Sequence, residues 1–323
     1  MALLGIDLGG TKVSTAVFSS KGEVLYKEII PLNNRKGAEA GALITGQVSR
    51  FLNSAEFQTD KIVSVGICVP GIYYSKTGIV WAPNIQGWEN YPLLEEVKAV
   101  AGDVPVTIDS DRACYILGEL WQGCAKGCRN AVFLAIGTGI GAGVLVNGGL
   151  LRGAHDIAGA IGWSALNRPF ESKYSSSGCF EYFASGEGIG RAARDVLQKQ
   201  PEYQGELSNK EVEKITSHDV FAAYKNNDEL AVQVIQLCIE FWGMAVANLI
   251  SLLDPEKIIF GGGVFGPAVS LIPAIKKEAE KWAQPLSVKE VSLEVSGLGG
   301  DAGVFGAGFL ALQNLNLNPT DDV

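Results

Sequence analysis

Short apolar runs separated by glycine-containing turns open the chain and predict β-strands. The pieces LLGIDLGG (3–10), VSTAVFSS (13–20) and EVLYKEII (23–30) are separated by a Gly-Gly turn and a Lys-Gly turn. Gaps this short join antiparallel neighbours. The pattern therefore predicts a three-stranded antiparallel meander.

Helical and strand patterns then alternate up to residue 121. A buried strand, KIVSVGICVP (61–70), ends at Pro70-Gly71. A second strand, VPVTID (104–109), leads into a helix that Asp111 opens, either as its N-cap or in its first turn. The expected helices are residues 37–53, 92–101 and 111–121.

The opening pattern returns near residue 130. NAVFLAIG, TGIG and AGVLVNG (130–148) repeat a strand, a glycine turn and a strand. Such an internal duplication predicts two similar lobes around a cleft, each presenting one glycine turn to a shared ligand. The remaining chain is expected to hold a loop-rich stretch at 151–185, helices at 187–199, 217–226, 228–253, from Pro267 and at 301–315, a strand at 257–260, and a polar, frayed tail.

Composition narrows the class of protein. The chain has 323 residues, 47% of them hydrophobic, and 40 glycines, which indicates roughly two globular domains. A net charge of −9, with no Lys/Arg-rich block, disfavours nucleic acid or an anionic membrane as a partner. The most apolar helical stretch, 232–253, contains Gln236, Glu240 and Asn248 and so predicts a buried helix. No signal peptide is expected before the first strand.

The six cysteines lie mostly in apolar or helical contexts. Reduced thiols and a cytoplasmic location are therefore expected. Cys124 and Cys128 form a C-x3-C pair, but no second pair stands at metal-ligand spacing, so a zinc site is not expected there.

The segment DLGGTK (7–12) combines residues that suit a bound nucleotide. Gly9 and Gly10 let backbone amides approach phosphate oxygens, and Thr11 and Lys12 add a hydroxyl and a charge. Asp7 could hold Mg²⁺, directly or through water. An ordinary hairpin, which also favours Gly-Gly, explains the segment alone equally well.

Two further glycine segments have the same character. In GTGIG (137–141), three glycines and a threonine fit a phosphate cradle, and two such turns at duplicated positions are hard to explain as hairpins alone. The third cluster, 261–263, follows a buried strand and would place flat backbone against adenine or ribose. Alternatively, these last glycines only open a helix.

Together these elements resemble the ROK family (repressors, open reading frames and kinases) of the sugar kinase, Hsp70 and actin superfamily. The motifs that carry the resemblance are DLGGTK (7–12), VPG (69–71), TG-x-V-x-x-PN (77–84) with Trp88, the Asp111 segment, GTGIG (137–141), GCFE (178–181) and GGGV (261–264). The resemblance implies an actin-like (ribonuclease H-like) α/β fold with two lobes and an interlobe cleft. It also implies a small lobe of residues 1–115 plus 305–323, with the first phosphate loop and sugar-site residues, and a large lobe of 116–304, with the second phosphate loop and the adenosine site.

The resemblance also implies roles for individual residues. Asp111 matches the catalytic aspartate, which activates a sugar hydroxyl; an N-cap role is the alternative, and one residue can do both. The expected ATP-binding residues are Asp7, Gly9, Gly10, Thr11, Lys12, Gly137, Thr138, Gly139, Gly141, Gly261, Gly262 and Gly263. The expected sugar-binding residues are Gly71, Asn84, Ser110, Asp111, Trp163 and Glu181. Asn84 could instead form only a Pro-Asn turn, Glu181 could be a solvated carboxylate, and Ser110 stands where the family usually has Asn.

The sequence departs from the family near residue 160. The family pattern G-E-x-G-H reads Gly-Ala160-Ile-Gly-Trp163 here, so a sugar-binding glutamate and a histidine that serves sugar and zinc are both replaced. Ser172 and Tyr174 occupy two of the family's cysteine positions, and only Cys179 remains. No zinc is therefore expected.

Aromatic side chains are expected to order this loop in the metal's place, or else to be ordinary core residues; they are Trp163, Phe170, Tyr174, Phe180, Tyr182 and Phe183. Trp163 could give a stacking face for a pyranose. His155 could replace a lost sugar contact, although a histidine in a loop is more often solvated.

The expected function is ATP- and Mg²⁺-dependent phosphorylation of a hexose or hexose derivative, at the 6-hydroxyl by analogy with the family, in a homodimer. One alternative is a catalytically weak or inactive sugar sensor that does not bind DNA, since a DNA-binding helix-turn-helix has no room before residue 7. The other is an acyl or carboxylate kinase, or an ATPase, of the same superfold. That class lacks the PN…W and GC-x-E elements.

Overall fold

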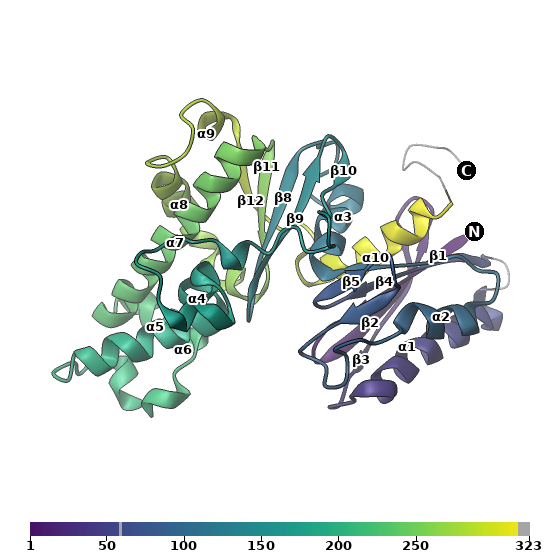
Figure 1. Ribbon diagram of the computed structural model, residues 1–323, viewed down its shortest axis with the longest axis horizontal. Coiled ribbons are helices and arrows are strands. Elements are labelled where there is room, and N and C mark those ends of the chain that lie inside the picture. Colours follow the sequence, from purple (N-terminus) through teal and green to yellow (C-terminus); the bar gives the residue numbers. More distant parts are fainter. Residues whose placement is uncertain (58–59, 316–323) are drawn as a thin grey trace. The chain divides into compact units, whose positions relative to one another are not determined.

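The computed structural model describes residues 1–57 and 60–315. The chain forms two compact units (Figure 1): unit 1 comprises Met1–Gly127, Leu150–Ala158 and Ser296–Val323, and unit 2 comprises Cys128–Gly149 and Gly159–Val295. The lobe limits expected from the sequence, 1–115 plus 305–323 and 116–304, stay a prediction. Residues 316–323 of the expected small lobe, which include the polar tail, lie outside the described residues.

Unit 1 is built on a five-stranded sheet of order β3-β2-β1-β4-β7. The first three strands pair antiparallel, which confirms the predicted meander, and β4 and β7 continue the sheet in parallel. The strands are β1 (Ala2–Leu8), β2 (Lys12–Ser19), β3 (Val24–Pro31), β4 (Ile62–Val69) and β7 (Val106–Ser110), with a separate hairpin of β5 (Ile72–Tyr74) and β6 (Ile79–Trp81).

Alternate residues of β1 are buried on opposite faces of this sheet, as the period of a strand requires. Leu4 and Ile6 belong to the core under α1 and α2, and Leu3 belongs to the core under α3 and α10. The helices are α1 (Gly37–Leu52), α2 (Leu93–Ala101), α3 (Asp111–Gln122) and α10 (Ala302–Gln313), with 3-10 turns at Ala55–Phe57 and Gly299–Asp301. All four helices were predicted from the sequence.

Glycines bring α10 into direct contact with β4 and α3. A Cβ atom on Gly66 of β4 would lie 1.9 Å from the carbonyl oxygen of Ala307, and one on Gly306 would lie 1.9 Å from the carbonyl oxygen of Cys114. Any larger residue at these positions would push the helix away. The last helix therefore packs as part of the core of unit 1.

Unit 2 repeats the strand order of unit 1, which confirms the predicted duplication. Its sheet has the order β10-β9-β8-β11-β12, with β8 and β9 antiparallel and β8, β11 and β12 parallel. The strands are β8 (Ala131–Ile136), β9 (Ile140–Val146), β10 (Gly149–Leu150), β11 (Lys257–Gly261) and β12 (Ser292–Val295). The edge strands β10 and β12 were not predicted.

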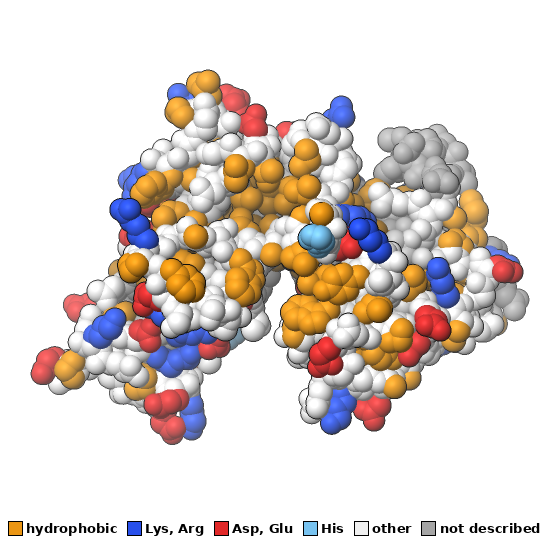
Figure 2. All heavy atoms as spheres, viewed as in Figure 1, with side chains coloured by type: hydrophobic (Ala, Val, Ile, Leu, Met, Phe, Trp, Pro, Cys, Tyr) orange, Lys and Arg blue, Asp and Glu red, His pale blue; other side chains and the backbone are white. Residues whose placement is uncertain are grey.

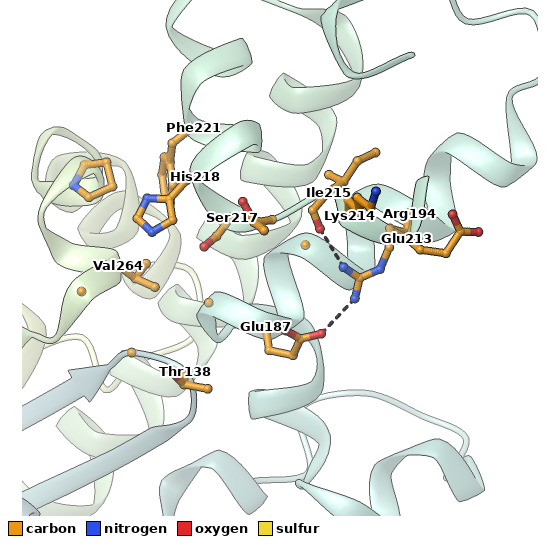
Figure 3. Close-up of a pocket in the computed structure, with 16 residues that line it drawn as sticks. Thr138, Glu187, Arg194, Glu213, Lys214, Ile215, Ser217, His218, Phe221 and Val264 are labelled. Carbon is orange, nitrogen blue, oxygen red and sulfur yellow. Dashed lines mark hydrogen bonds and ion pairs between the residues drawn. The ribbon is translucent and has the colours of Figure 1, made fainter. Parts of the chain in front are cut away.

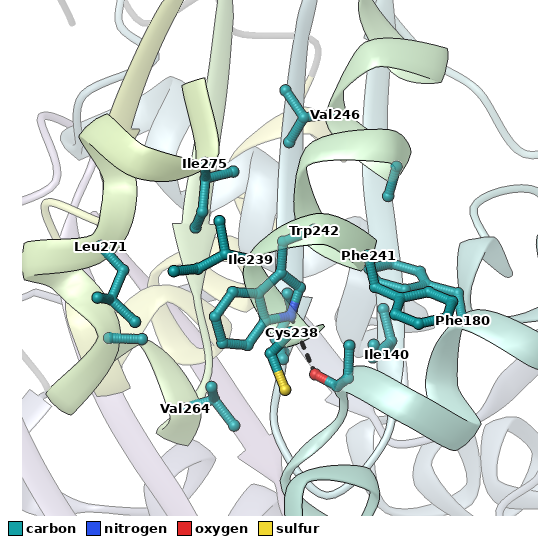
Figure 4. Close-up of a cluster of buried hydrophobic side chains, with 14 of the residues drawn as sticks. Ile140, Phe180, Cys238, Ile239, Phe241, Trp242, Val246, Val264, Leu271 and Ile275 are labelled. Atoms are coloured by element: carbon teal, nitrogen blue, oxygen red, sulfur yellow. Dashed lines mark hydrogen bonds between the residues drawn. The ribbon is translucent and has the colours of Figure 1, made fainter. Parts of the chain in front are cut away.

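The core of unit 2 is organised around α7 (Figure 4). Trp242 of this helix is fully buried, and its Nε1 donates to the carbonyl oxygen of Ala184 at 3.0 Å. The helices are α4 (Cys179–Ala184), α5 (Gly186–Lys199), α6 (Ser217–Lys225), α7 (Glu229–Leu253), α8 (Ile272–Ala279) and α9 (Ser287–Glu290). The 3-10 turns are Ile161–Trp163, Ser172–Ser176, Glu206–Asn209, Val212–Lys214, Gly263–Phe265 and Pro267–Leu271. The helix expected from Pro267 thus begins as a 3-10 turn.

In the described part of the chain, α7 is the one helix long and apolar enough to cross a membrane by length and composition. Of its most apolar stretch, 67% is buried inside the protein, as expected for a core helix. On the face drawn in Figure 2, Lys and Arg side chains are interspersed with Asp and Glu over both units.

Candidate active site

Asp7 and Asp111 are the two carboxylates around which the site in unit 1 is arranged. Asp7 lies near the end of β1, and Asp111 is the first residue of α3, after the N-cap residue Ser110. The first-turn position is therefore the correct one of the two predicted for Asp111. Its Oδ1 accepts a hydrogen bond from the backbone N–H of Arg112 at 2.8 Å.

Burial raises the pKa of both carboxyls to about 6, and the negative charges of Asp301 near Asp7 and of Asp7 near Asp111 contribute to the increase. Lys12 opposes the shift at Asp7, and Arg112 opposes it at Asp111. Two partly buried carboxylates that repel each other would both be stabilised by a cation. The residues present therefore fit a divalent ion held with phosphate oxygens.

The turn between β1 and β2 leaves its backbone uncovered. The N–H of Gly9 donates to the carbonyl oxygen of Lys12 at 2.9 Å, while Gly10, Thr11 and Lys12 are exposed. A Cβ on Gly10 would meet no atom within 4 Å, and Gly10 is not among the residues with positive φ. Neither packing nor backbone conformation requires glycine there, which favours a ligand that approaches the backbone closely over a simple hairpin.

In unit 2, the turn between β8 and β9 is tied to the start of α5. The N–H of Gly186 donates to the carbonyl oxygen of Gly137 at 2.7 Å, and the N–H of Gly137 donates to the carbonyl oxygen of Gly139 at 2.9 Å. Ser185 caps α5 by accepting from the N–H of Gly188 at 3.0 Å. A helix N-terminus beside a glycine turn is a favourable place for phosphate.

A cavity of about 610 Å³ opens at this turn (Figure 3). This volume suits a nucleoside-sized ligand. Arg194 lies along one side, where it donates to Glu187 at 2.9 Å and to the carbonyl oxygen of Ile215 at 2.7 Å. The lining residues are Gly137, Thr138, Gly186, Glu187, Gly190, Arg194, Glu213, Lys214, Ile215, Thr216, Ser217, His218, Phe221, Gly263, Val264 and Pro267.

Different structural constraints act at the three glycines of residues 261–263. A Cβ on Gly261 would lie 2.2 Å from the Phe133 ring, and Gly262 combines a φ of +86° with a Cβ position 2.4 Å from the carbonyl oxygen of Ile136. Only Gly263 has open space at its Cβ, and it lines the cavity. Packing and backbone conformation therefore account for two of the three.

Sequence reasoning missed much of this cavity. The segment 213–218 and the first turns of α5 line it, yet neither was named as a candidate site. A signal was present in Ser185 followed by GEGIG (186–190), because glycines at the start of a capped helix favour a bound anion.

The predicted sugar residues of unit 1 lie on the β5–β6 hairpin and at the start of α3. Gly71 has a φ of +83°, and a Cβ added there would lie 2.2 Å from the carbonyl oxygen of Trp81. The carbonyl oxygen of Gly71 accepts a hydrogen bond from Arg112 Nη2 at 3.3 Å.

Asn84 is exposed in the turn that follows β6. Trp88 anchors this turn, because it is buried and its Nε1 donates to the carbonyl oxygen of Gly37 at 3.0 Å. Ser110 is 8% exposed.

Glu181 and Trp163, the predicted sugar residues of unit 2, have different surroundings. Glu181 lies on α4, half-buried, and its Oε2 accepts from the backbone N–H of Ile140 at 2.6 Å. The alternative of a solvated loop carboxylate is therefore wrong. Trp163 is 57% exposed at the end of a 3-10 turn, so its ring is available to a ligand.

The loop that lacks the family's zinc ligands is ordered around Tyr174. This ring is 4% exposed, and its centroid lies 5.5 Å from that of Tyr182 and 5.7 Å from that of Phe183. The Lys173 ammonium lies 5.4 Å from the Tyr174 and Tyr182 centroids. Phe180 is buried in the same core as Tyr174, and Phe170, although 76% exposed, lies with its ring centroid 6.2 Å from that of Tyr174.

Among residues 1–57 and 60–315, no three His, Cys, Asp or Glu side chains are grouped to hold a metal ion by themselves.

His155 is exposed and lines a second cavity of about 350 Å³ in unit 1, with Tyr74 and Asp156 among the other lining residues.

Known proteins resemble this chain over nearly its full length. The chain is 33% identical over 320 residues to a glucokinase from Halalkalibacterium halodurans, covering 97% of this chain and 96% of that protein. The structure resembles a ROK family glucokinase from Streptomyces griseus solved with glucose and AMPPNP (TM-score 0.75, 26% identity, 97% of this chain and 100% of that one). It also resembles a ROK family transcriptional regulator homologous to the E. coli MLC protein (TM-score 0.84, 27% identity, 97% and 78%).

These similarities confirm the predicted actin-like α/β fold. The ROK family model matches residues 3–314. With the duplicated sheet, the two glycine turns and Asp111 at the start of α3, this match establishes that the chain belongs to the ROK family.

Proposed function

We propose that this chain transfers the γ-phosphoryl group of ATP to a hydroxyl of a hexose or hexose derivative, with Asp111 as the base. The chain is an ATP-dependent sugar kinase by its relationship to the ROK glucokinases. The observation that carries the finer proposal is the position of Asp111. It is a partly buried carboxylate with a pKa of about 6, on a helix start that packing holds in place.

The cavity of unit 2 is the proposed site of the nucleoside. Ile215, Phe221 and Val264 offer apolar contacts to a base, and Thr138 and the first turn of α5 lie where phosphates would meet backbone N–H groups. The turn at 9–12 and Asp7 would serve the terminal phosphates. Asp7 would hold Mg²⁺ together with phosphate oxygens, and the ion would neutralise charge on the transferring group.

The sugar is proposed to contact Gly71, Asn84, Ser110, Asp111 and Glu181, with Trp163 offering a face to the ring. The carboxylates accept hydrogen bonds from hydroxyls, and the Asn84 carboxamide both donates and accepts. We assign the 6-hydroxyl as the acceptor by analogy with the family.

The proposed reaction is a single displacement at the γ-phosphorus of ATP. The sugar hydroxyl oxygen forms a bond to the γ-phosphorus, and the bond from that phosphorus to the β,γ-bridging oxygen breaks. The hydroxyl proton passes to Asp111, and ADP leaves with the electron pair of the broken bond. The products are a sugar phosphate, ADP and a proton released later by Asp111.

A sugar-binding regulator without catalysis is the second candidate. The similarity to a ROK transcriptional regulator supports it, as does the replacement of the family's sugar-binding glutamate by Ala160. The uncovered glycine turn at 9–12 and the intact Asp111 favour the kinase, because binding alone needs neither. We further propose a cytoplasmic homodimer, as the family resemblance implies.

A substrate panel separates the two candidates. ADP release would be measured with ATP and Mg²⁺ against hexoses and N-acetylhexosamines, and products would be identified by mass spectrometry. The kinase proposal predicts turnover with at least one sugar and a product heavier by one phosphate. Binding of a sugar without any turnover would overturn it in favour of the regulator.

A further inference from the structure

Glu181 lies directly against the glycine turn at 137–141. Its Oε2 accepts from the backbone N–H of Ile140 at 2.6 Å, a charge-assisted hydrogen bond. A Cβ on Gly139 would lie 2.8 Å from the same oxygen, so glycine is what allows the turn to pass over the carboxylate. A predicted sugar residue thus contacts the predicted phosphate-binding turn within unit 2.

Hydrogen bonds to the backbone of Tyr182 and Ala184 fix α4, the helix that carries Glu181, to the neighbouring helices. Arg191 Nη1 donates to the carbonyl oxygen of Tyr182 at 3.1 Å, and its guanidinium lies 4.4 Å from the centre of the Tyr182 ring. Trp242 Nε1 donates to the carbonyl oxygen of Ala184 at 3.0 Å (Figure 4). The backbone of α4 is therefore a rigid support, and Glu181 can respond to a ligand only through its side chain.

The other end of the glycine turn lines the nucleotide cavity. Gly137 and Thr138 are lining residues, and Gly137 is bonded to Gly186 at the start of α5 at 2.7 Å. Only Thr138 and Gly139 separate Gly137 from Ile140. A change in the bond at Ile140 therefore reaches the cavity through a very short piece of backbone.

The carboxylate of Glu181 can bind a sugar hydroxyl and Ile140 at the same time. Burial raises the pKa of Glu181, whereas the Ile140 bond and the positive charge of Arg191 lower it. A carboxylate accepts several hydrogen bonds at once, so a sugar hydroxyl can bind Glu181 without displacing Ile140. A hydroxyl that donates to the carboxylate also restricts the Glu181 side chain to the conformation that accepts from Ile140, so the bond to Ile140 is retained more of the time.

We propose that Glu181 couples the two substrates: its bond to Ile140 holds the phosphate-binding turn in place, and a sugar hydroxyl bound to the same carboxylate tightens that hold. The coupling rests on the proposed function, since it takes the turn as a phosphate site and Glu181 as a sugar ligand. It raises nucleotide affinity when sugar is present and leaves ATP less firmly held when sugar is absent.

The test is the affinity for AMPPNP with Mg²⁺, measured by calorimetry without sugar and with a saturating concentration of the best substrate from the panel. The wild-type protein is expected to bind AMPPNP about tenfold more tightly with sugar, within the usual range of coupling. Without sugar, Glu181→Ala is expected to weaken AMPPNP binding about fivefold, although Glu181 does not line the cavity. In Glu181→Gln, which keeps an acceptor for Ile140, this loss is expected to be smaller.

Glu240→Ala is the matched control, because Glu240 is an exposed carboxylate on α7 of the same unit. It is expected to keep wild-type affinity and coupling. Unchanged sugar-free AMPPNP affinity in a folded Glu181→Ala protein would overturn the inference, and so would a wild-type protein in which sugar has no effect on AMPPNP. Either result with sugar phosphorylation intact would leave the proposed function standing.

Discussion

The backbone of Gly303 in α10 lies against the carboxylate of Asp7 in β1, and a Cβ atom at residue 303 would lie 2.5 Å from Oδ2 of Asp7. The last helix of the chain thus forms part of the surroundings of a carboxylate near its beginning. This contact explains why the end of the sequence matters to a site that begins at residue 7.

Gly303→Ala is therefore expected to displace Asp7. Overpacking at a buried position costs about 1–3 kcal/mol, and kcat is expected to fall at least tenfold because Asp7 no longer meets the Mg²⁺ of bound ATP. Steady-state kinetics at saturating ATP and thermal unfolding measure the two effects. Gly300→Ala is the control, since a Cβ there would meet no atom within 4 Å. Equal activity in the two variants would contradict the assignment of Asp7.

Activity is expected to fall in acid because the base must be ionised. Burial places the pKa of Asp111 at about 6 in the free protein, so kcat/KM is expected to decrease about tenfold per pH unit below that value. The pKa of Asp7 is also about 6, and its charge raises the pKa of Asp111, so the observed pKa belongs to the pair. A pH profile of kcat/KM that stays flat from pH 7 to pH 4.5 would argue against both assignments.

Asp111→Asn is expected to stabilise the ligand-free protein near neutral pH. Folding raises the pKa of Asp111 from its ordinary 3.8 to about 6, so its contribution to stability is full below about pH 4 and is lost as the pH rises through 6. Asn has no charge to bury and can still accept from the N–H of Arg112. Allowing for solvent screening, the free energy of unfolding at pH 7.5 is expected to rise by on the order of 1 kcal/mol.

Thermal unfolding at pH 7.5 and pH 4 measures this effect. The gain should be present at pH 7.5 and largely absent at pH 4, where Asp111 is protonated in the folded protein. A variant that is less stable than the wild-type protein at pH 7.5 would show that the carboxylate serves mainly to stabilise the N-terminus of α3.

The loop at 160–179 is expected to depend on Tyr174 and not on a metal. Tyr174→Ala removes a buried ring with several aromatic neighbours, which is expected to cost about 3 kcal/mol and to raise the KM for sugar through Glu181 on the adjoining α4. Phe170→Ala is the control, because this ring is 76% exposed. Loss of activity on treatment with 1,10-phenanthroline in the presence of Mg²⁺ would contradict the prediction of no zinc.

Much of the fold could be predicted because periodic patterns decide it. The two strand–glycine turn–strand copies, the meander and the long helices all follow from local sequence, and the structure contains them. The edge strands β10 and β12, two and four residues long, were missed because so short a run has no readable period. Their pairing with β9 and β11 is what makes them strands.

The candidate site was harder to predict because contacts across the sequence create it. The DLGGTK and GTGIG segments indicated phosphate binding, but nothing local to Ile215 or His218 shows that they line the cavity of unit 2. Gly303 likewise carries no signal of its contact with Asp7, since the two are distant in sequence. For Glu181, the family motif suggested a sugar ligand, and only the structure gave its bond to Ile140.

The most direct test of the central claim compares the wild-type protein with Asp111→Asn in one experiment. Sugar phosphorylation would be followed by ADP release, and sugar binding by calorimetry, with the best substrate of the panel. The account predicts that kcat falls at least a thousandfold in the variant, within the range of lost general-base catalysis, while sugar binding changes less than about tenfold. A variant that phosphorylates the sugar within tenfold of the wild-type rate would contradict the account, because Asp111 would then not be the base.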